Sequence, residues 1–265
     1  MRQVYNTNHT FAVCAYRDSP YLEECLRSLT GQNKPTNIIV CTSTPSPHIE
    51  GLARKYGLPV YVREGESDIQ EDWNFAYNQA ETQFVTIAHQ DDLYGPDYTA
   101  VLFEKIRRYP DLSIFFCSYE AIKGEVRMPR ERSCMVKRLL CLPVSVTALA
   151  DRTWLKKSCL CLGNGISCPM ITYNRNIVGT SIFQSSLKYA LDWEMNLKLA
   201  GMPGRFVYVR RPLGCYRIHD GATSKQFILN HKKEKEDREM FAHFWPEWLV
   251  NLIMKAYRKS YSAYD

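Results

Sequence analysis

The chain has 265 residues, of which 45% are hydrophobic and 23% are charged, and its formal net charge is +6. This length and composition fit one large α/β domain and exclude an intrinsically disordered chain. The mild positive charge comes without a dense basic tract, which argues against a nucleic-acid partner. No apolar run reaches the length that spans a bilayer, and the first ten residues lack the apolar core of a signal peptide. We therefore expect a cytoplasmic protein.

The ten cysteines do not form a metal-binding or disulfide pattern. Five of them stand singly within apolar stretches, where cysteine behaves as a small hydrophobic residue: Cys14, Cys25, Cys41, Cys117 and Cys215. Cys159, Cys161 and Cys168 come closest to a cluster, but their spacing is not C-x-x-C. We expect reduced thiols and no zinc site.

Apolar stretches suited to buried strands alternate with helix-like segments through the first 117 residues. The helical segments carry apolar residues three and four positions apart, and Asp68 with Glu71 forms a D-x-x-E capping pair. We expect strands at 11–16, 37–41, 59–63, 84–88 and 113–117, and helices near 22–31, 48–57, 68–80 and 98–106. Short connections between alternating strands and helices predict a mostly parallel sheet with helices on both faces.

The second half of the chain is less regular. Residues 120–133 are polar and predict a hairpin or loop, and later segments predict a strand within 163–174, a helix at 187–200 and a strand at 205–210. From residue 225 the chain is helical in character, and its mixed-charge run KKEKEDRE is typical of a solvated helix face. We find no repeats and no linker, so we expect one domain.

Two adjacent carboxylates, Asp91 and Asp92, directly follow the fourth expected strand in the stretch VTIAHQDDLYGP. One interpretation is structural: Asp92 or Asp97 caps the next helix beside Pro96. The other is a divalent cation site, because Mg²⁺ and Mn²⁺ prefer oxygen ligands. Ligands bind beyond the carboxyl ends of the strands in sheets of this kind, and this position favours the cation site.

Seven short motifs follow one another in an informative order. They are AYRDSPYLEECLRSLTGQ, NIIVCTSTPS, DWNFAYNQA, FVTIAHQDD, GNGISCP, LDWEMNLKLAG and YRIHDGATS, and they extend from about residue 10 to residue 224. Each motif is weak alone, but their order and spacing resemble the family 2 glycosyltransferases of the GT-A fold. The likeness is to the bacterial members that build surface polysaccharides.

The resemblance implies an α/β fold with a GT-A, Rossmann-like, mostly parallel sheet flanked by helices and with a C-terminal helical extension. It implies a single domain over residues 1–265. Within this domain, the half that binds the nucleotide sugar covers about residues 8–117, and the acceptor and catalytic half covers about residues 118–224. A helical tail covers about residues 225–265.

In the family, a D-x-D element at this strand end binds a divalent cation, Mn²⁺ or Mg²⁺, which holds the diphosphate of a nucleotide-sugar donor. The resemblance implies that Asp91 is the main metal ligand and that Asp92 supports the metal or the sugar hydroxyls. His89 stands where the family usually has its first Asp, and it either ligates the metal or orients the sugar or ribose. His219 matches a family histidine close to the metal and the phosphates.

The expected nucleotide site departs from the family pattern. Thr42 and Ser43 stand where the family commonly has two aspartates near the base and the ribose, and Asp68 or Asp72 is the candidate for the missing acid. Asn74 matches a family asparagine near the donor. The other expected donor-binding residues are Tyr16, at the end of the first strand, and Arg217 and Ser224, whose cation and hydroxyl suit a diphosphate.

An inverting sugar transfer needs a base that takes the proton of the acceptor hydroxyl. Asp192 in LDWEMNLKLA matches the family's base, whereas Leu191 replaces the glutamate that precedes it in the family. The alternative is that Asp192 only caps its helix. GNGISCP resembles the acceptor-side segment, which makes Asn164 and Gly165 the expected acceptor-binding residues.

The expected partners are a nucleotide sugar, most simply a UDP-sugar, and a saccharide or lipid-linked acceptor. The C-terminal stretch WPEWLVNLIMKAYRKSYSAY either packs on the domain or touches the inner face of the membrane through its aromatic and basic residues. Two other functions remain alternatives. A nucleotidyltransferase also uses aspartate–metal chemistry, although AYRDSPYLE lacks the glycines of its usual loop. The other is a non-catalytic nucleotide-sugar-binding module.

Overall fold

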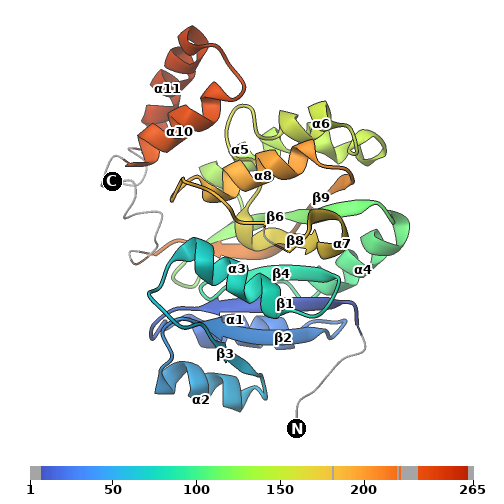
Figure 1. The fold of residues 1–265 in the computed structure, drawn as a ribbon, viewed down its shortest axis with the longest axis vertical. Helices are drawn as coiled ribbons and strands as arrows, with labels where there is room; N and C mark the ends of the chain where they lie inside the picture. Colours follow the sequence, from blue (N-terminus) through green and yellow to red (C-terminus); the bar gives the residue numbers. More distant parts are fainter. Residues whose placement is uncertain (1–6, 181, 220, 222–231, 262–265) are drawn as a thin grey trace.

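The protein folds around a single large mixed sheet, seen in the computed structural model, which describes residues 7–180, 182–219, 221 and 232–261 (Figure 1). The strands follow the order β3-β2-β1-β4-β8-β6-β9-β5, and β7 pairs with β6. Their bounds are β1 His9–Ala15, β2 Asn37–Thr42, β3 Val60–Val62, β4 Phe84–His89, β5 Leu93–Tyr94, β6 Leu112–Lys123, β7 Val126–Met128, β8 Ile171–Asn174 and β9 Arg205–Arg217.

Helices cover both faces of this sheet (Figure 1). Their bounds are α1 Leu22–Thr30, α2 Pro47–Lys55, α3 Ile69–Gln79, α4 Tyr98–Arg108, α5 Arg132–Leu140, α6 Thr153–Ser158, α7 Arg175–Val178, α8 Leu191–Gly201, α10 Lys232–Ala242 and α11 Glu247–Tyr261. Three short 3₁₀ turns, η1 Pro143–Ser145, η2 Thr147–Leu149 and η3 Cys168–Met170, join the elements of the second half.

Most of the strands run in one direction, as the sequence predicts. β1 pairs in parallel with β2 and β4, β3 pairs in parallel with β2, and β6 pairs in parallel with β9. β8 lies antiparallel between β4 and β6, and the two-residue β5 lies antiparallel beside β9. The sheet is therefore mixed, because β8 returns along the chain between two strands that point the other way.

Alternation along β1 divides the core into two layers. Ala12 faces a cluster that includes residues of α3, α8, α10 and α11, whereas Phe11 and Val13 face a cluster that includes residues of α1, α2 and α4. This period of two is what a strand buried on both faces requires. Because β1 is parallel to β2 and β4, the carboxyl ends of these three strands lie at the same edge of the sheet.

Local signals place several elements where the sequence predicts them. The side chain of Asp68 accepts hydrogen bonds from the amides of Gln70 (3.0 Å) and Glu71 (3.3 Å), so it caps α3. The polar segment after residue 120 forms the β6–β7 hairpin, whose turn at Gly124 has a φ of 58°. All ten cysteine thiols are free.

The C-terminal charge run is the main difference from the expected elements. Lys233 and Asp237 of α10 are 7% and 1% exposed and form an ion pair, so this face is buried rather than solvated. Phe241 of α10 packs against Trp193 of α8 and Tyr257 of α11. Among the described residues, no helix is both long enough and apolar enough to cross a membrane.

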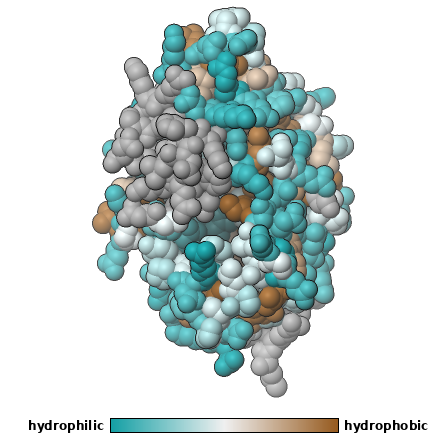
Figure 2. All heavy atoms as spheres, turned by 60° about the vertical axis from the view of Figure 1, so that its left-hand side comes forward, coloured by the Kyte–Doolittle hydropathy of each residue, from teal (hydrophilic) through white to brown (hydrophobic). Residues whose placement is uncertain are grey.

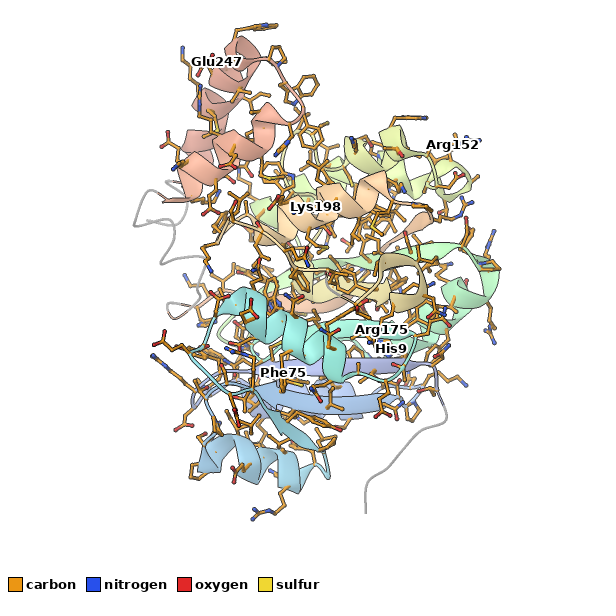
Figure 3. The ribbon with its side chains drawn as sticks, viewed as in Figure 1. His9, Phe75, Arg152, Arg175, Lys198 and Glu247 are labelled. Atoms are coloured by element: carbon orange, nitrogen blue, oxygen red, sulfur yellow. The ribbon has the colours of Figure 1, made fainter. Side chains whose placement is uncertain are left out.

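A buried histidine in β1 gives the fold a titratable core position. His9, labelled in Figure 3, has no exposed surface; its Nε2 lies 2.9 Å from Thr86 Oγ1 and its Nδ1 lies 3.2 Å from Thr36 Oγ1. Burial lowers the pKa of His9 from 6.5 to about 3. The folded protein therefore holds this imidazole neutral, while the unfolded chain takes up a proton below pH 6.5.

We expect His9 to steepen the loss of stability in acid. Because the unfolded state binds the extra proton, the free energy of unfolding should fall as pH drops from 6.5 towards 3, by up to about 1.4 kcal/mol per pH unit from this group. Urea unfolding of wild type and His9→Gln at a series of pH values measures it. The variant should have a shallower slope, and His243→Gln, at an exposed position, should keep the wild-type slope. Equal slopes for wild type and His9→Gln would contradict the assignment.

Candidate active site

A cavity of about 700 Å³ lies at the carboxyl edge of the parallel strands. Its wall includes Tyr16 after β1, Thr42 at the end of β2, Asp91 after β4, Asp192 in the first turn of α8 and His219 after β9. Figure 2 faces this side of the molecule, where the surface is hollowed and hydrophilic residues gather at the hollow. Residues expected from separate motifs, as far as 203 positions apart (219 minus 16), thus surround one space.

The end of β4 gathers three groups that are able to bind a metal ion. One ligand atom from each of His89, Asp91 and Asp92 lies within 4.8 Å of the others. The His89 ring stacks on Trp73, with ring centroids 5.0 Å apart and an interplanar angle of 27°. Within the described residues, the buried atoms His89 Nε2 and Asp92 Oδ2 have no hydrogen-bond partner. Buried polar atoms are rarely left unpaired, so this set fits a cation that would use them.

The two adjacent carboxylates differ in their electrostatic environment. Burial, reinforced by the charge of Asp91, raises the pKa of Asp92 well above its ordinary value. Burial also acts to raise the pKa of Asp91, but the hydrogen bond with His219 and the nearby His89 outweigh it and bring the pKa below its ordinary value. Burial lowers the pKa of His89. Without a cation, the charge of one carboxylate therefore opposes ionisation of the other.

Arg217 of β9 braces the turn that carries these carboxylates. Its amide donates to Asp92 Oδ1 (2.9 Å), its Nε donates to the Asp91 carbonyl (2.9 Å), and its guanidinium pairs with Glu24 (2.6 Å). The guanidinium also lies 4.5 Å from the centroid of the Tyr21 ring. Arg217 is 3% exposed and is not part of the described cavity wall, so its contacts hold the turn.

His219 reaches the site from the far end of β9. Its Nε2 lies 2.9 Å from Asp91 Oδ2, and its ring packs on Tyr21 with centroids 4.8 Å apart. His219 is thus joined directly to the carboxylate that the family resemblance makes the main metal ligand. Ser224, expected further along the same segment, lies outside the described residues.

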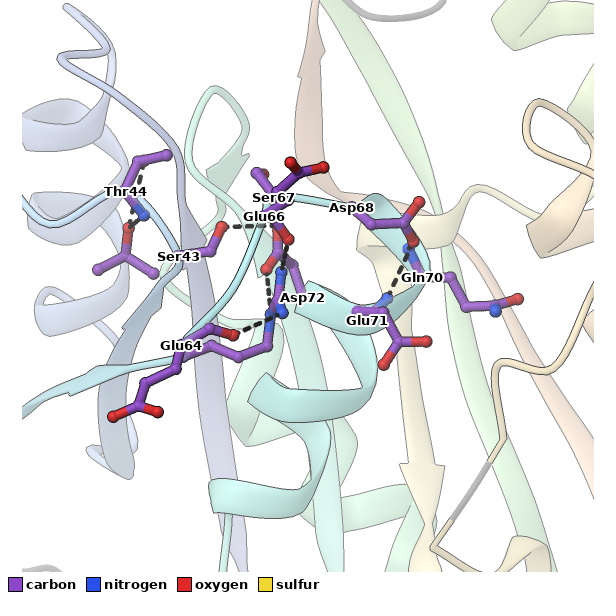
Figure 4. A network of polar contacts seen from close by, with 11 residues as sticks. Ser43, Thr44, Glu64, Glu66, Ser67, Asp68, Gln70, Glu71 and Asp72 are labelled. Atoms are coloured by element: carbon purple, nitrogen blue, oxygen red, sulfur yellow. Dashed lines mark hydrogen bonds and ion pairs between the residues drawn. The ribbon is translucent and has the colours of Figure 1, made fainter.

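A second polar cluster lies at the end of β2 (Figure 4). Asp72 of α3 accepts hydrogen bonds from Ser43 (3.0 Å) and Ser67 (2.8 Å) and pairs with Arg63 (2.7 Å). Asp72 therefore supplies a carboxylate beside Ser43, at a strand end that has none of its own. Asp68, the other candidate acid, caps α3 and pairs with Lys188 at 2.6 Å.

The rest of the expected donor set takes different positions. Tyr16 is 41% exposed on the cavity wall. The Tyr16 amide donates to Gln90 Oε1 (2.9 Å), and the Tyr16 carbonyl accepts from Gln90 Nε2 (3.0 Å). Thr42 is buried, and its hydroxyl accepts from the Thr44 amide (3.0 Å). Asn74 is not part of the described wall, because its amide group forms two hydrogen bonds with the backbone of Phe183.

Asp192 faces the cavity from the first turn of α8. Asn164 Nδ2 donates to Asp192 Oδ2 at 2.9 Å, so two residues expected on the acceptor side are in direct contact. Burial raises the pKa of Asp192, while Lys137 of α5 opposes the shift. A raised pKa brings a carboxylate closer to the range in which it accepts a proton effectively.

Gly165 acts through the backbone rather than from the cavity wall. Its amide donates to the Cys159 carbonyl (3.0 Å), and a Cβ at this position would lie only 2.6 Å from that oxygen. A glycine is therefore required for the close approach that carries Asn164 to Asp192. Sequence reasoning missed the cavity residues Gln90, Arg17 and Lys137. Gln90, inside FVTIAHQDD, and Arg17, inside AYRDSPYLEECLRSLTGQ, lay within motifs already singled out, whereas Lys137 lay in none of them.

Solved structures with the same architecture are glycosyltransferases. S. aureus TarS 1-349 in complex with UDP-GlcNAc has a TM-score of 0.63 and 15% identity, covering 94% of this chain and 70% of that chain. A mannosyltransferase from Pyrobaculum calidifontis, in complex with GDP-Man and Mn²⁺, has a TM-score of 0.60 and 15% identity over 96% of this chain and 70% of that one. Glucosyl-3-phosphoglycerate synthase from Mycobacterium tuberculosis has a TM-score of 0.53 and 12% identity, covering 89% and 79%.

The fold and these likenesses define a glycosyltransferase of the GT-A class. The model of the family described as Glycosyl transferase family 2 matches residues 10–158, which is more than half of the chain, and the chain belongs to that family. No curated protein gives a significant sequence match.

The backbone that leads into α8 is held by a carboxylate from α10. Glu236 accepts hydrogen bonds from the amides of Lys188 (3.1 Å), Tyr189 (2.7 Å) and Ala190 (2.8 Å). Ala190 is the N-cap residue of α8 and offers no side-chain cap. Glu236, which comes from α10, thus accepts the hydrogen bonds of three amides that would otherwise lack an acceptor. These amides directly precede the first turn of α8, which carries Asp192.

We expect Glu236→Gln to loosen the start of α8. Replacing the carboxylate by an amide removes the charge from these hydrogen bonds, which should lower the free energy of unfolding by about 1–3 kcal/mol. Hydrogen exchange at the amides of residues 188–190 should be faster. Glu239→Gln, an exposed position one turn further along α10, is the matched control. Unchanged exchange at residues 188–190 in Glu236→Gln would show that the carboxylate does not hold this segment.

Proposed function

We propose that the protein is a metal-dependent, inverting glycosyltransferase. It transfers a sugar from a nucleotide sugar, a UDP-sugar in the simplest case, to a saccharide or lipid-linked acceptor in surface-polysaccharide synthesis. The observation that carries the proposal is that one cavity joins the His89–Asp91–Asp92 group to Asp192. In this proposal residues up to about 117 form the donor half and residues from about 118 to 224 form the acceptor half.

The cation would be held mainly by Asp91, with His89, Asp92 and His219 close to it. Carboxylate ligands suit Mn²⁺, and the buried atoms His89 Nε2 and Asp92 Oδ2, which have no hydrogen-bond partner among the described residues, support a site that a cation completes. Two of the similar structures are complexes with Mn²⁺. The bound ion would neutralise the diphosphate of the donor and of the leaving nucleotide.

The nucleotide would lie towards the ends of β1 and β2. Asp72, oriented by Arg63 and Ser43, offers a carboxylate that is able to accept a hydrogen bond from a base or a ribose. The Tyr16 side chain is exposed at the rim and offers an aromatic face for stacking. TarS has been solved in complex with UDP-GlcNAc and with UDP, which supports a uridine nucleotide sugar as the first donor to test.

Asp192 would act as the base that takes the proton of the acceptor hydroxyl. Its carboxylate faces the cavity, Asn164 orients it, and burial raises its pKa towards a range suited to proton transfer. As the proton leaves, the hydroxyl oxygen attacks the anomeric carbon from the face opposite the diphosphate, which inverts the configuration. Asp192 and the metal-binding group therefore have separate tasks at two parts of one cavity.

We expect Asp91→Asn to abolish sugar transfer and the metal-dependent binding of the nucleoside diphosphate. The fold should survive, because Asp91 lies at the rim of the sheet. Donor hydrolysis with Mn²⁺ and with EDTA, together with calorimetric binding of UDP, measures both effects. Asp97→Asn, which changes a carboxylate outside the described cavity wall, should behave as wild type. A wild-type rate in Asp91→Asn would refute the metal assignment, and no turnover by wild type would favour the non-catalytic binding module.

We expect Asp192→Asn to lower the rate constant about a hundredfold or more, because the amide cannot accept the proton. Donor affinity should stay nearly unchanged, since the base acts on the acceptor. Only the ionised carboxylate is a base, so the wild-type rate should fall as pH drops through the raised pKa of Asp192. The residual rate of Asp192→Asn should lack this acid limb. A fully active variant, or an unchanged acid limb, would assign the base to another group.

A further inference from the structure

Exposed apolar side chains gather at one end of the molecule. The described residues include 13 large hydrophobic side chains that are exposed, and only Tyr16, Val62 and Val126 of these precede residue 135. The other ten belong to two segments, and we call them the α5–α11 face: Met135, Val136, Leu139, Leu142, Val146, Leu149, Trp154, Leu162, Trp248 and Leu252. A concentration of this kind marks an interaction surface more often than scattered apolar residues do.

The two segments meet in space. Trp245, two residues before α11, donates its indole N–H to the carbonyl of Cys161 at 2.6 Å, directly before the exposed Leu162. A Cβ built on Gly163 would lie within 3.5 Å of both Leu140 of α5 and Tyr257 of α11. The end of α5, the loop at 161–163 and α11 therefore adjoin one another. Figure 1 draws α5, α6 and α11 on the same side of the sheet, at the end of the molecule opposite α2.

The charge around this face is positive. Residues 132–162 contain six arginines and lysines and one acid, Asp151. Arg132, Arg152 and Lys157 are exposed, and so is Lys255 of α11. The acid beside Trp248, Glu247, pairs with Arg238 at 3.3 Å. Figure 3 shows Arg152 and Glu247 at this end of the molecule, pointing away from the sheet.

Two of the chain's five tryptophans, Trp154 and Trp248, are 65% and 69% exposed on this face. Tryptophan prefers the boundary between water and lipid, because its ring is apolar and its N–H is polar. Basic side chains around exposed apolar ones are attracted by anionic headgroups. A second copy of the same face would bring its basic side chains against like charges, which opposes self-association.

We infer that the α5–α11 face binds the surface of an anionic lipid bilayer, with the chain lying on the membrane rather than spanning it. Of the α11 side chains that the structure describes, Trp248 and Leu252 belong to this face, whereas Tyr257, like Trp245 just before the helix, is engaged by the domain. Most of the contact comes from residues 135–162, a surface that the sequence did not indicate.

The face adjoins the acceptor side of the cavity. Lys137 of α5, Asn164 and Tyr257 line the cavity. Along the chain they are two to five positions from Leu139, Leu162 and Leu252 of the α5–α11 face. A chain docked by this face holds the Asp192 side of its cavity towards the bilayer, which favours an acceptor carried on a lipid. This consequence rests on the proposed function, whereas binding to the bilayer does not.

Sedimentation with vesicles tests the inference on the whole chain. Wild type should bind vesicles of phosphatidylcholine with phosphatidylglycerol at 0.1 M NaCl, should bind pure phosphatidylcholine about tenfold less, and should be largely released at 0.5 M NaCl. Trp154→Ser with Trp248→Ser should weaken binding about tenfold or more. The matched control, Val62→Ser with Val126→Ser, removes two exposed apolar side chains elsewhere and should bind as wild type.

Donor hydrolysis in the absence of vesicles separates this inference from the proposed function. The Trp154→Ser, Trp248→Ser protein should hydrolyse donor as wild type does, and Asp91→Asn should bind vesicles while hydrolysing no donor. No salt-sensitive binding by wild type, or equal binding by the double tryptophan variant, would overturn the inference. Another outcome would also overturn the inference: wild type does not bind vesicles but forms a dimer, and the two tryptophan substitutions dissociate that dimer. The α5–α11 face would then be a contact between two copies of the chain.

Discussion

The candidate active site depends on keeping two adjacent carboxylates at the end of a buried strand. Asp91 and Asp92 repel one another when both are ionised, and Asp92 is only 1% exposed, so water does little to screen them. The protein opposes this repulsion with His219 beside Asp91 and with the backbone and side chain of Arg217 around the turn. A cation that binds both carboxylates would relieve the remaining strain, which links the stability of the turn to its ligand.

The sequence indicated the sheet because its signals are local. A strand buried on both faces is a short apolar run, and the capping group of Asp68 is visible from its spacing to α3. The strand expected within 163–174 is β8, but its antiparallel direction was not predicted, because contacts with distant strands set it. The two-residue β5 was not predicted at all. The buried Lys233–Asp237 pair was misread for the same reason: a run of mixed charge does not reveal which of its members a neighbouring helix covers.

The candidate site was predictable where one residue type stands at a strand end. Asp91 could be chosen because it stands directly beyond a buried strand. Asp192 is one of several acids in the first turns of helices, and only the family resemblance singled it out. The contribution of Glu236 could not be found, because its three hydrogen bonds join residues 46 to 48 positions apart. Asn74 shows the converse: its motif suggested the donor, but its amide group is bound to the backbone of Phe183.

The bracing of the Asp91–Asp92 turn by Arg217 has a consequence for folding. Arg217 lies 126 positions beyond Asp91 and 193 positions beyond Glu24, so these contacts close only when most of the chain has been synthesised. Contacts of such long range form late, because the chain loses entropy in closing the loop before it gains their energy. A nascent chain that ends before β9 already contains Asp91 and Asp92. It still lacks Arg217, whose guanidinium and amide hold their turn. In the proposed function, donor binding therefore waits until β9 is in place.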